Sequence, residues 1–170
     1  FGLPQDAVEM VKAFRKLDYA PAMFVAQGAA DPRIVARLGQ DAERAIGITP
    51  WEQALRTPGN ARFAESYLRK WSAEPTALAA QGYAAGKIIE EAVRRAGVLE
   101  QEALREAFAA LRTETPLGGY AVDRDGAQRA ARPALVQIQN GRREIVWPEA
   151  LATARWQLPY PRWQERRVLK

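Results

Sequence analysis

The residues that most often perform chemistry in enzymes are scarce in this chain. Its 170 residues include no histidine and no cysteine. A Ser-His or Cys-His nucleophile, a histidine-ligated metal, a catalytic thiolate, structural zinc and disulfides are therefore all excluded. Carboxylates, amides and aromatic rings remain as candidate functional groups. We therefore expect a protein that is not an enzyme and that needs neither a metal nor a cofactor.

The acidic residues form no catalytic set. Glu90 and Glu91 are adjacent on a predicted helix, so they point to different faces. Asp123-x-Asp125-Gly126 has part of the spacing of a calcium loop but lacks its third oxygen ligand, and Asx chemistry in a tight turn explains it better. Three more carboxylates surround a predicted helix start, where they favour the helix dipole: Glu100, Glu102 and Glu106.

Two places in the chain are better candidates for ligand contact. Gln27-Gly28-Ala29 follows an apolar run, residues 22–26, that is typical of a buried strand. Ligands of open α/β sheets bind beyond the carboxyl ends of the strands, although a plain strand-to-helix turn explains these small residues equally well. Trp51 also follows a predicted strand, where it either walls an apolar pocket or packs where the chain crosses between lobes.

The first 50 residues predict the elements that position these candidates. Val8, Val11, Phe14 and Leu17 recur at helical spacing after Asp6, whose capping-box spacing to Glu9 predicts the start of this helix; it ends near Asp18. Residues 22–26 and 45–49 read as strands, and Asp31-Pro32 predicts the start of a helix between them. This alternation indicates a doubly wound α/β architecture.

The pattern changes after Pro50-Trp51. Residues 50–60 are rich in proline, glycine and polar side chains, as expected of a crossing between two lobes. Three predicted helices follow without an intervening strand. The first begins at Asn60, a predicted cap, and carries an aromatic stripe that we expect to lie in the core. Gly97 is predicted to end the second helix. An extended segment over 117–123 and a hairpin over 134–148, turning at Asn140-Gly141, complete the pattern. The members of the stripe are Phe63, Tyr67 and Trp71.

The net charge of +5 is concentrated near the C-terminal end. From Arg129 to Lys170 there are nine basic and three acidic side chains. A basic end can indicate nucleic-acid binding, but these arginines are spread over a hairpin and a tail, and no glycine-aromatic RNA-binding signature accompanies them. We interpret the charge as a solubilising surface and expect no nucleic-acid partner.

Taken in order, these motifs resemble the second half of the branched-chain amino-acid-type substrate-binding proteins of ABC transporters. The resemblance begins with residues 26–32, Ala-Gln-Gly-Ala-Ala-Asp-Pro, and residues 47–51, Gly-Ile-Thr-Pro-Trp. It continues through residues 63–67, 79–85 and 92–97, and closes with residues 118–120, 123–126, 136–138 and 141–148. It covers nearly the whole chain.

The resemblance implies an α/β fold class: a partial type I periplasmic-binding-protein fold, with parts of two α/β lobes joined by crossing segments and ligand held in the cleft. Residues 1–52 would belong to the C-terminal lobe and 53–133, mostly helical, to the N-terminal lobe. Residues 134–170 would form the hairpin and tail that return to the C-terminal lobe. The family's first half has no counterpart here, so the missing N-terminal half of the same protein is an expected partner.

The resemblance also implies a site and a role. Gln27, Gly28 and Ala29 match the family's cleft loop, and Ala80, Gln81 and Tyr83 match the opposite edge, with Trp51 nearby. The family can place an acidic residue at the cleft loop to hold an α-ammonium, whereas Gln27 is neutral. With a neutral residue at this position, a small aromatic or aliphatic carboxylate is as plausible a ligand as the hydrophobic amino acid that the resemblance implies.

The implied function is the extracytoplasmic solute-binding component of an ABC importer, periplasmic or at the cell surface, with the transporter's membrane subunits as partners. The chain itself carries no signal segment. An alternative is a ligand-sensing domain of a signalling or regulatory protein with the same fold.

Overall fold

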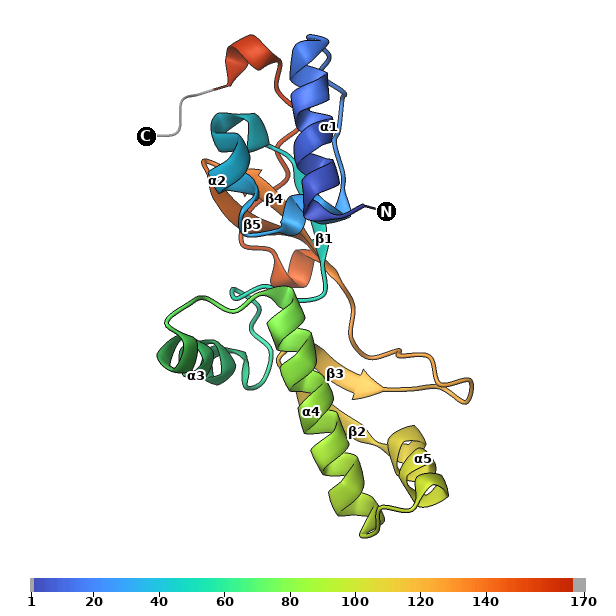
Figure 1. Ribbon diagram of the computed structural model, residues 1–170. Helices are drawn as coiled ribbons and strands as arrows, with labels where there is room; N and C mark the ends of the chain where they lie inside the picture. The colour runs from blue at the N-terminus through green and yellow to red at the C-terminus, as the bar shows by residue number, and fades with distance from the viewer. Residues whose placement is uncertain (1, 167–170) are drawn as a thin grey trace. The chain divides into compact units, whose positions relative to one another are not determined.

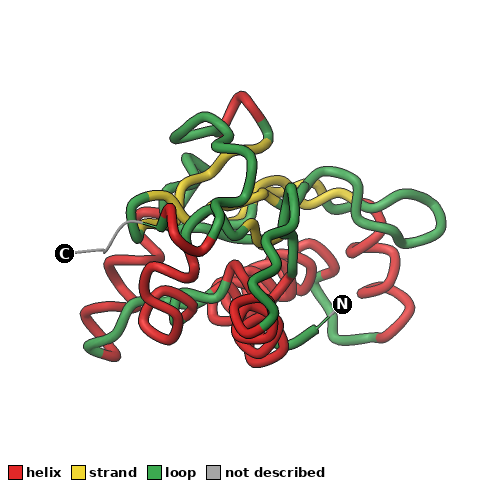
Figure 2. The backbone as a smooth tube through the Cα atoms, turned by 90° about the horizontal axis from the view of Figure 1, so that it is seen from above, coloured by secondary structure: helices red, strands yellow, loops and turns green. Residues whose placement is uncertain are grey.

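The computed structural model describes residues 2–166, which divide into two compact units. The first unit runs up to Thr49 and resumes at Ala134, and the second is Pro50–Pro133. Strands are short, and loops make up much of the chain between the helices (Figure 2). Within residues 2–166, no helix is both long and apolar enough to span a bilayer.

The first unit opens with helix α1, Pro4–Lys16. Val8 and Val11 of the predicted stripe are almost fully buried and Phe14 is half-buried, whereas Leu17 lies just past the end of the helix and is 73% exposed. The predicted start at Asp6 is wrong by one turn. Asp6 occupies the third helical position, and its carboxylate accepts the backbone N–H of Leu3 at 2.6 Å, because Pro4 already fits the first helical position.

A small sheet forms the centre of this unit, in the order β1 (Ile46–Thr49), β4 (Ala134–Gln139), β5 (Arg142–Trp147) (Figure 1). Both pairings are antiparallel, and Ile46 lies opposite Gln137. The β4–β5 hairpin turns at Asn140-Gly141 as predicted, because both residues take positive φ, 52° and 73°.

The predicted strand over residues 22–26 is reduced to a single bridge, Val25 with Ile46, and this pairing is parallel. The 3₁₀ turn η1 (Gln27–Ala30), helix α2 (Ile34–Leu38) and the 3₁₀ turn η2 (Gly39–Ala42) connect the two paired segments. Helix α2, which was predicted after Asp31-Pro32, is only five residues long. It ends at Gly39, whose φ is 54°.

The core of the first unit lies between the helices and one face of the sheet. Ala7 and Val8 of α1 pack with Ile34 of α2 and Ile138 of β4. A neighbouring cluster joins α1 to residues 22–26, here called the Val25 segment, and to the tail after β5. Its buried members are Val11, Phe24, Ala29, Ala45 and Tyr160.

The tail after β5 covers the opposite face of the sheet through glutamine amides. The amide of Gln137, fully buried, donates to the Gln157 carbonyl at 2.9 Å and accepts the Gln157 N–H at 2.9 Å. Gln139 donates to the Arg155 carbonyl at 2.7 Å. The tail includes two short 3₁₀ turns, η3 (Glu149–Leu151) and η4 (Trp163–Glu165), and residues 167–170 lie outside the described residues.

The second unit holds the three helices predicted from the sequence: α3 (Asn60–Trp71), α4 (Ala77–Ala96) and α5 (Gln101–Ala110) (Figure 1). Gly97 ends α4 with a φ of 71°, as predicted. Asn60 is not the cap of α3. Gly59 takes that position, because the Asn60 side chain turns inward to Trp51.

A two-stranded antiparallel sheet, β2 (Arg112–Thr115) and β3 (Gly118–Ala121), completes the second unit. The sequence predicts β3 as an extended segment but misses β2, whose Arg-Thr-Glu-Thr sequence is short and wholly polar. Ala92, Ala107 and Leu111 form the core between α4, α5 and these strands.

Candidate functional site

A groove of about 440 Å³ lies in the first unit, beside the start of α1 and the end of the Val25 segment. Most of its wall is apolar, and two of the predicted ligand contacts, Gln27 and Gly28, are part of it. The complete lining is Gly2, Leu3, Asp6, Ala7, Met10, Val25, Ala26, Gln27, Gly28 and Ile48.

The turn η1 positions the predicted cleft loop. Gln27 is exposed, so its amide is free to meet a solute. Gly28 is buried against the start of α1, and a Cβ there would approach the Leu3 carbonyl oxygen to 2.6 Å and the Pro4 Cα to 2.7 Å. Glycine is therefore required for this close approach. The Ala29 methyl is fully buried in the core, so its side chain serves packing.

The carboxylates near this loop are paired within the protein. Asp31 accepts the Arg33 Nε at 2.9 Å and Nη2 at 2.8 Å, together with the Arg33 backbone N–H. The Arg33 guanidinium holds the pKa of Asp31 below its usual value. Asp6 is the one ionisable side chain of the groove, and it binds the Leu3 N–H. The groove thus offers an amide, apolar walls and one carboxylate, that of Asp6.

The three residues predicted on α4 lie in different environments. Ala80 is fully buried, Gln81 is exposed and Tyr83 is 46% exposed. Gln81 lines a second hollow of about 380 Å³, within the second unit, together with Ile88 and Tyr120. The Tyr83 ring lies 4.9 Å from the Phe63 ring. Of these three, Gln81 and Tyr83 therefore present side chains at the surface.

Trp51 is almost completely buried, at 3% exposure. Its ring packs edge-to-face on Phe63 at 5.8 Å, and Phe63 in turn contacts Tyr67 and Tyr83. The predicted core stripe of α3 therefore runs from a buried end at Phe63 to the surface at Trp71, which is 59% exposed. The structure thus brings two of the predicted site residues, Trp51 and Tyr83, into one aromatic cluster.

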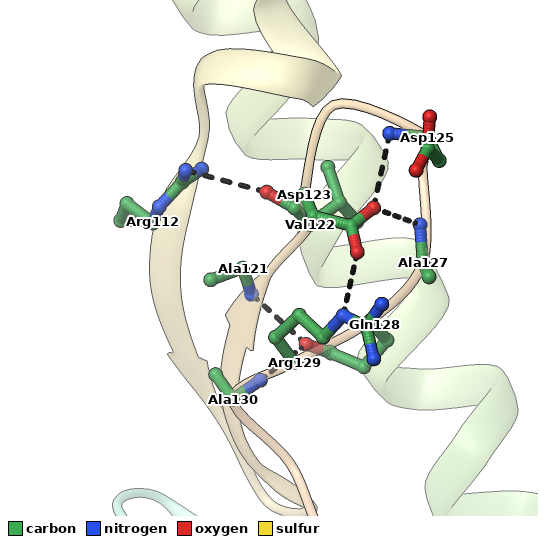
Figure 3. Close-up of polar contacts among 9 residues, drawn as sticks. All are labelled: Arg112, Ala121, Val122, Asp123, Asp125, Ala127, Gln128, Arg129 and Ala130. Carbon is green, nitrogen blue, oxygen red and sulfur yellow. Dashed lines mark hydrogen bonds and ion pairs between the residues drawn. The ribbon is translucent and has the colours of Figure 1, made fainter.

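The loop around Asp123 is a structural turn, as predicted (Figure 3). One carboxylate oxygen of Asp123 accepts the backbone N–H groups of Asp125 (3.0 Å) and Ala127 (2.9 Å). The other oxygen accepts Arg129 Nε at 2.5 Å, which lowers the pKa of Asp123. Gly126 supplies the positive φ of the turn, 81°. Across residues 2–166, no cluster of acidic side chains is arranged to hold a metal ion.

Sequence reasoning missed three apolar residues of the groove in the first unit. Met10 lies between two inward-facing valines of α1, yet it is 46% exposed. Val25 and Ile48 belong to runs predicted as buried strands, and each is 42% exposed. Such runs predict burial on both faces, so no signal in the sequence distinguishes the members that line a groove.

Residues 1–143 match the family described as periplasmic binding protein. A Leu/Ile/Val-binding protein homologue of Brucella abortus (strain 2308) is 29% identical over 108 residues, which cover 61% of this chain and 27% of that protein. The chain therefore spans well under half the length of the curated relatives it matches.

Two solved structures illustrate the likeness in fold. The leucine-binding protein LivK of Thermotoga maritima superposes with a TM-score of 0.73 and 24% identity, covering 85% of this chain and 41% of LivK. An ABC transporter solute-binding protein of R. palustris, solved in complex with benzoate, superposes with a TM-score of 0.72 and 18% identity. The match covers 86% of this chain and 41% of the R. palustris protein.

Proposed function

This chain belongs to the periplasmic binding protein family, and we propose that it is part of the solute-binding component of an ABC importer. Its mixed helix and sheet architecture is a partial type I periplasmic-binding-protein fold, as predicted from the sequence. Family and fold are those of solute-binding proteins, which are not enzymes.

We propose that the solute is a hydrophobic amino acid or a small aromatic or aliphatic carboxylate. The observation that carries this choice is the groove beside Gln27, with apolar walls and an exposed neutral amide. Apolar walls suit the body of such a solute, and a few polar groups fix its orientation. The solved relatives include a leucine-binding protein and a protein in complex with benzoate. Leucine and benzoate are solutes of these two kinds.

Within each unit, the proposed contacts follow from exposure. In the first unit, the Gln27 side chain and the Gly28 backbone are proposed to meet the solute, with Ala29 supporting them from the core. In the second unit, Gln81 and Tyr83 are the proposed contacts, because their side chains reach the surface. Trp51 and Ala80 are buried and are proposed to support them.

The proposal extends to the surroundings of the protein. Members of the periplasmic binding protein family are extracytoplasmic, and we propose the same location here. The proposed partners are the membrane subunits of the transporter, together with the missing N-terminal half of the same protein. Support for the second partner comes from the solved relatives, of which this chain covers about two fifths.

Calorimetric titration of the full-length protein tests this function. Leucine and benzoate are the probes, and glucose, which has neither a carboxylate nor an apolar body, is the control. We expect saturable binding of at least one probe and none of glucose. Circular dichroism verifies that the protein is folded. The proposal is contradicted if the folded protein binds none of leucine, isoleucine, valine and benzoate.

A further inference from the structure

The turn of the β4–β5 hairpin carries a sequence that can modify itself. The chain contains two asparagines, and only Asn140 is followed by glycine. In an Asn-Gly pair the glycine nitrogen can reach the carbonyl carbon of the asparagine side chain, because glycine has no side chain that blocks the approach. Asn140 is exposed, so water can reach its side-chain amide. The residue types, their order and their exposure are therefore those of a deamidation site.

Deamidation of Asn140 needs no reagent except water. A bond forms between the Gly141 nitrogen and Cγ of Asn140, and the bond from Cγ to the side-chain nitrogen breaks. The proton of the Gly141 N–H is transferred through solvent to that nitrogen, which leaves as ammonia. Water then opens the cyclic imide at either of its carbonyl carbons. The product is aspartate, or isoaspartate, in which the side-chain methylene becomes part of the main chain.

Glu43 holds this turn in its unreactive form. Its Oε1 accepts the Asn140 N–H at 2.9 Å, and its Oε2 accepts the Gly141 N–H at 3.4 Å. Asn140 and Gly141 both have positive φ, as a type I′ turn requires. For the reaction, Gly141 must release its N–H and its nitrogen must rotate toward Cγ of Asn140, so the contact with Glu43 has to break. Loss of the proton also places negative charge beside the Glu43 carboxylate, which disfavours it.

The loop that carries Glu43 is itself fixed to the hairpin. Glu43 is half-buried between η2 and β1, and its N–H donates to the Gln40 carbonyl at 3.1 Å. The next residue, Arg44, donates its N–H to the Ile138 carbonyl of β4 at 2.7 Å. The backbone thus holds the carboxylate beside the turn. We propose that Asn140 is a site of spontaneous deamidation and that Glu43 slows the reaction by keeping the turn closed.

The product of the reaction fits this contact poorly. Either product carries a carboxylate on the residue whose N–H Glu43 accepts, and like charges repel. The reaction therefore removes the restraint that delays it, and it is irreversible because ammonia is lost to solvent. Strand β4 of this hairpin carries Gln137 and Gln139, which bind the tail, so a change at the turn acts on the central sheet of the first unit. The inference concerns the chain's own chemistry and does not rest on the proposed function.

Incubation of the folded full-length protein in heavy-oxygen water, followed by digestion in ordinary water and peptide mass spectrometry, tests the proposal. The peptide with Asn140 should exchange its amide nitrogen for heavy oxygen, and the peptide with the buried Asn60, which precedes alanine, should not. In Glu43→Ala the rate at Asn140 should rise about ten-fold, because hydrogen bonds to a charged group are lost and the turn opens more often. Glu65→Ala, at an exposed glutamate of α3, should leave the rate unchanged. No conversion at Asn140 in any of these proteins, or equal rates in the two variants, would overturn the proposal.

A mimic of the product gives a second readout, which applies even if Glu43→Ala does not fold. Asn140→Asp places the carboxylate of the product in the turn and should lower Tm of the full-length protein by about 2 °C. In a Glu43→Gln background the same substitution should cost less, because the repulsion is gone while a side-chain oxygen still accepts an N–H. A loss of Tm of the same size in both backgrounds would contradict the role of Glu43. Neither readout involves a solute, so a failure here is distinct from a failure to bind leucine or benzoate.

Discussion

The indole Nε1 of Trp51 donates a hydrogen bond of 2.6 Å to Oδ1 of Asn60, and both side chains are almost fully buried. The Asn60 amide then donates to the backbone carbonyls of Leu55 (2.7 Å) and Gln53 (3.1 Å). One side chain thus holds the loop between Trp51 and α3 in place. It also fixes the Trp51 ring against Phe63.

Asn60→Ala should lower the free energy of unfolding by about 3 kcal/mol, since the indole N–H and the loop carbonyls would lose their partner inside the protein. Urea denaturation of the 170-residue chain measures the change. Ser66→Ala, at an exposed position of the same helix, is the matched control and should change stability by about 0.5 kcal/mol or less. Equal effects of the two substitutions would show that the Asn60 hydrogen bonds contribute little.

Helix α4 carries two glycines in its interior, Gly82 and Gly86, with open space where a Cβ would stand. Glycine in a helix interior costs about 1 kcal/mol relative to alanine. Gly82→Ala and Gly86→Ala should each stabilise the 170-residue chain by about that amount, as measured by urea denaturation. Gly47→Ala is the contrasting variant, because its Cβ would lie 2.1 Å from the Ala30 nitrogen, and it should destabilise.

If Gly82→Ala or Gly86→Ala instead destabilised the chain, the open space at α4 would have to be filled in solution by another part of the protein or by a second copy. Sedimentation at several concentrations distinguishes these two results, because association of copies depends on concentration.

The turns and helix ends that depend only on neighbouring residues were predicted correctly from short sequence motifs. Asn140-Gly141 specified its turn because both residues tolerate positive φ. Gly97 ended α4 for the same reason. The Asp123 turn is equally local, since its carboxylate binds backbone groups two and four residues further on. None of these predictions depended on distant parts of the chain.

The errors arose where partners distant in space compete with local preference. Asn60 has the side chain of a helix cap, but burial beside Trp51 gives it more hydrogen bonds than a cap would. Residues 22–26 have the composition of a central strand, which pairs with a neighbour on each side. Among the described residues only β1 pairs with them, and the pairing is a single bridge. The groove was not foreseen because Met10 and Ile48 lie in apolar runs that predict burial, and the sequence does not distinguish the members that stay exposed.

The Asp123 turn should lose stability in acid. Arg129 and the N–H groups of Asp125 and Ala127 favour the ionised carboxylate, so the pKa of Asp123 in the folded protein lies below its usual value. The stabilisation from the charge is therefore complete above the unfolded pKa, about 3.9, and is lost as the pH falls through the lower folded pKa. NMR titration of the Ala127 amide measures this transition.

Asp123→Asn is the control for that titration, because it keeps an oxygen that can accept the backbone N–H groups but cannot ionise. The acid transition at Ala127 should disappear in this variant. In Arg129→Gln, the transition should move to higher pH, since the guanidinium that favours the carboxylate is removed. A transition that stays at the same pH in Arg129→Gln would contradict the role of the ion pair.

Gln27→Glu tests the proposed solute contact through charge. A carboxylate at position 27 would repel the carboxylate of benzoate, and at close range in a partly solvated site such a repulsion costs about 1 kcal/mol or more. Leucine also carries a carboxylate, but its ammonium offsets the repulsion. Calorimetry on the full-length protein should therefore show the ratio of the benzoate Kd to the leucine Kd rising about five-fold or more. Gln101→Glu adds the same charge at the start of α5, outside the groove, and should leave the ratio unchanged. An unchanged ratio in Gln27→Glu would remove Gln27 from the site, because no residue in contact with an anionic solute can gain a charge without altering its affinity.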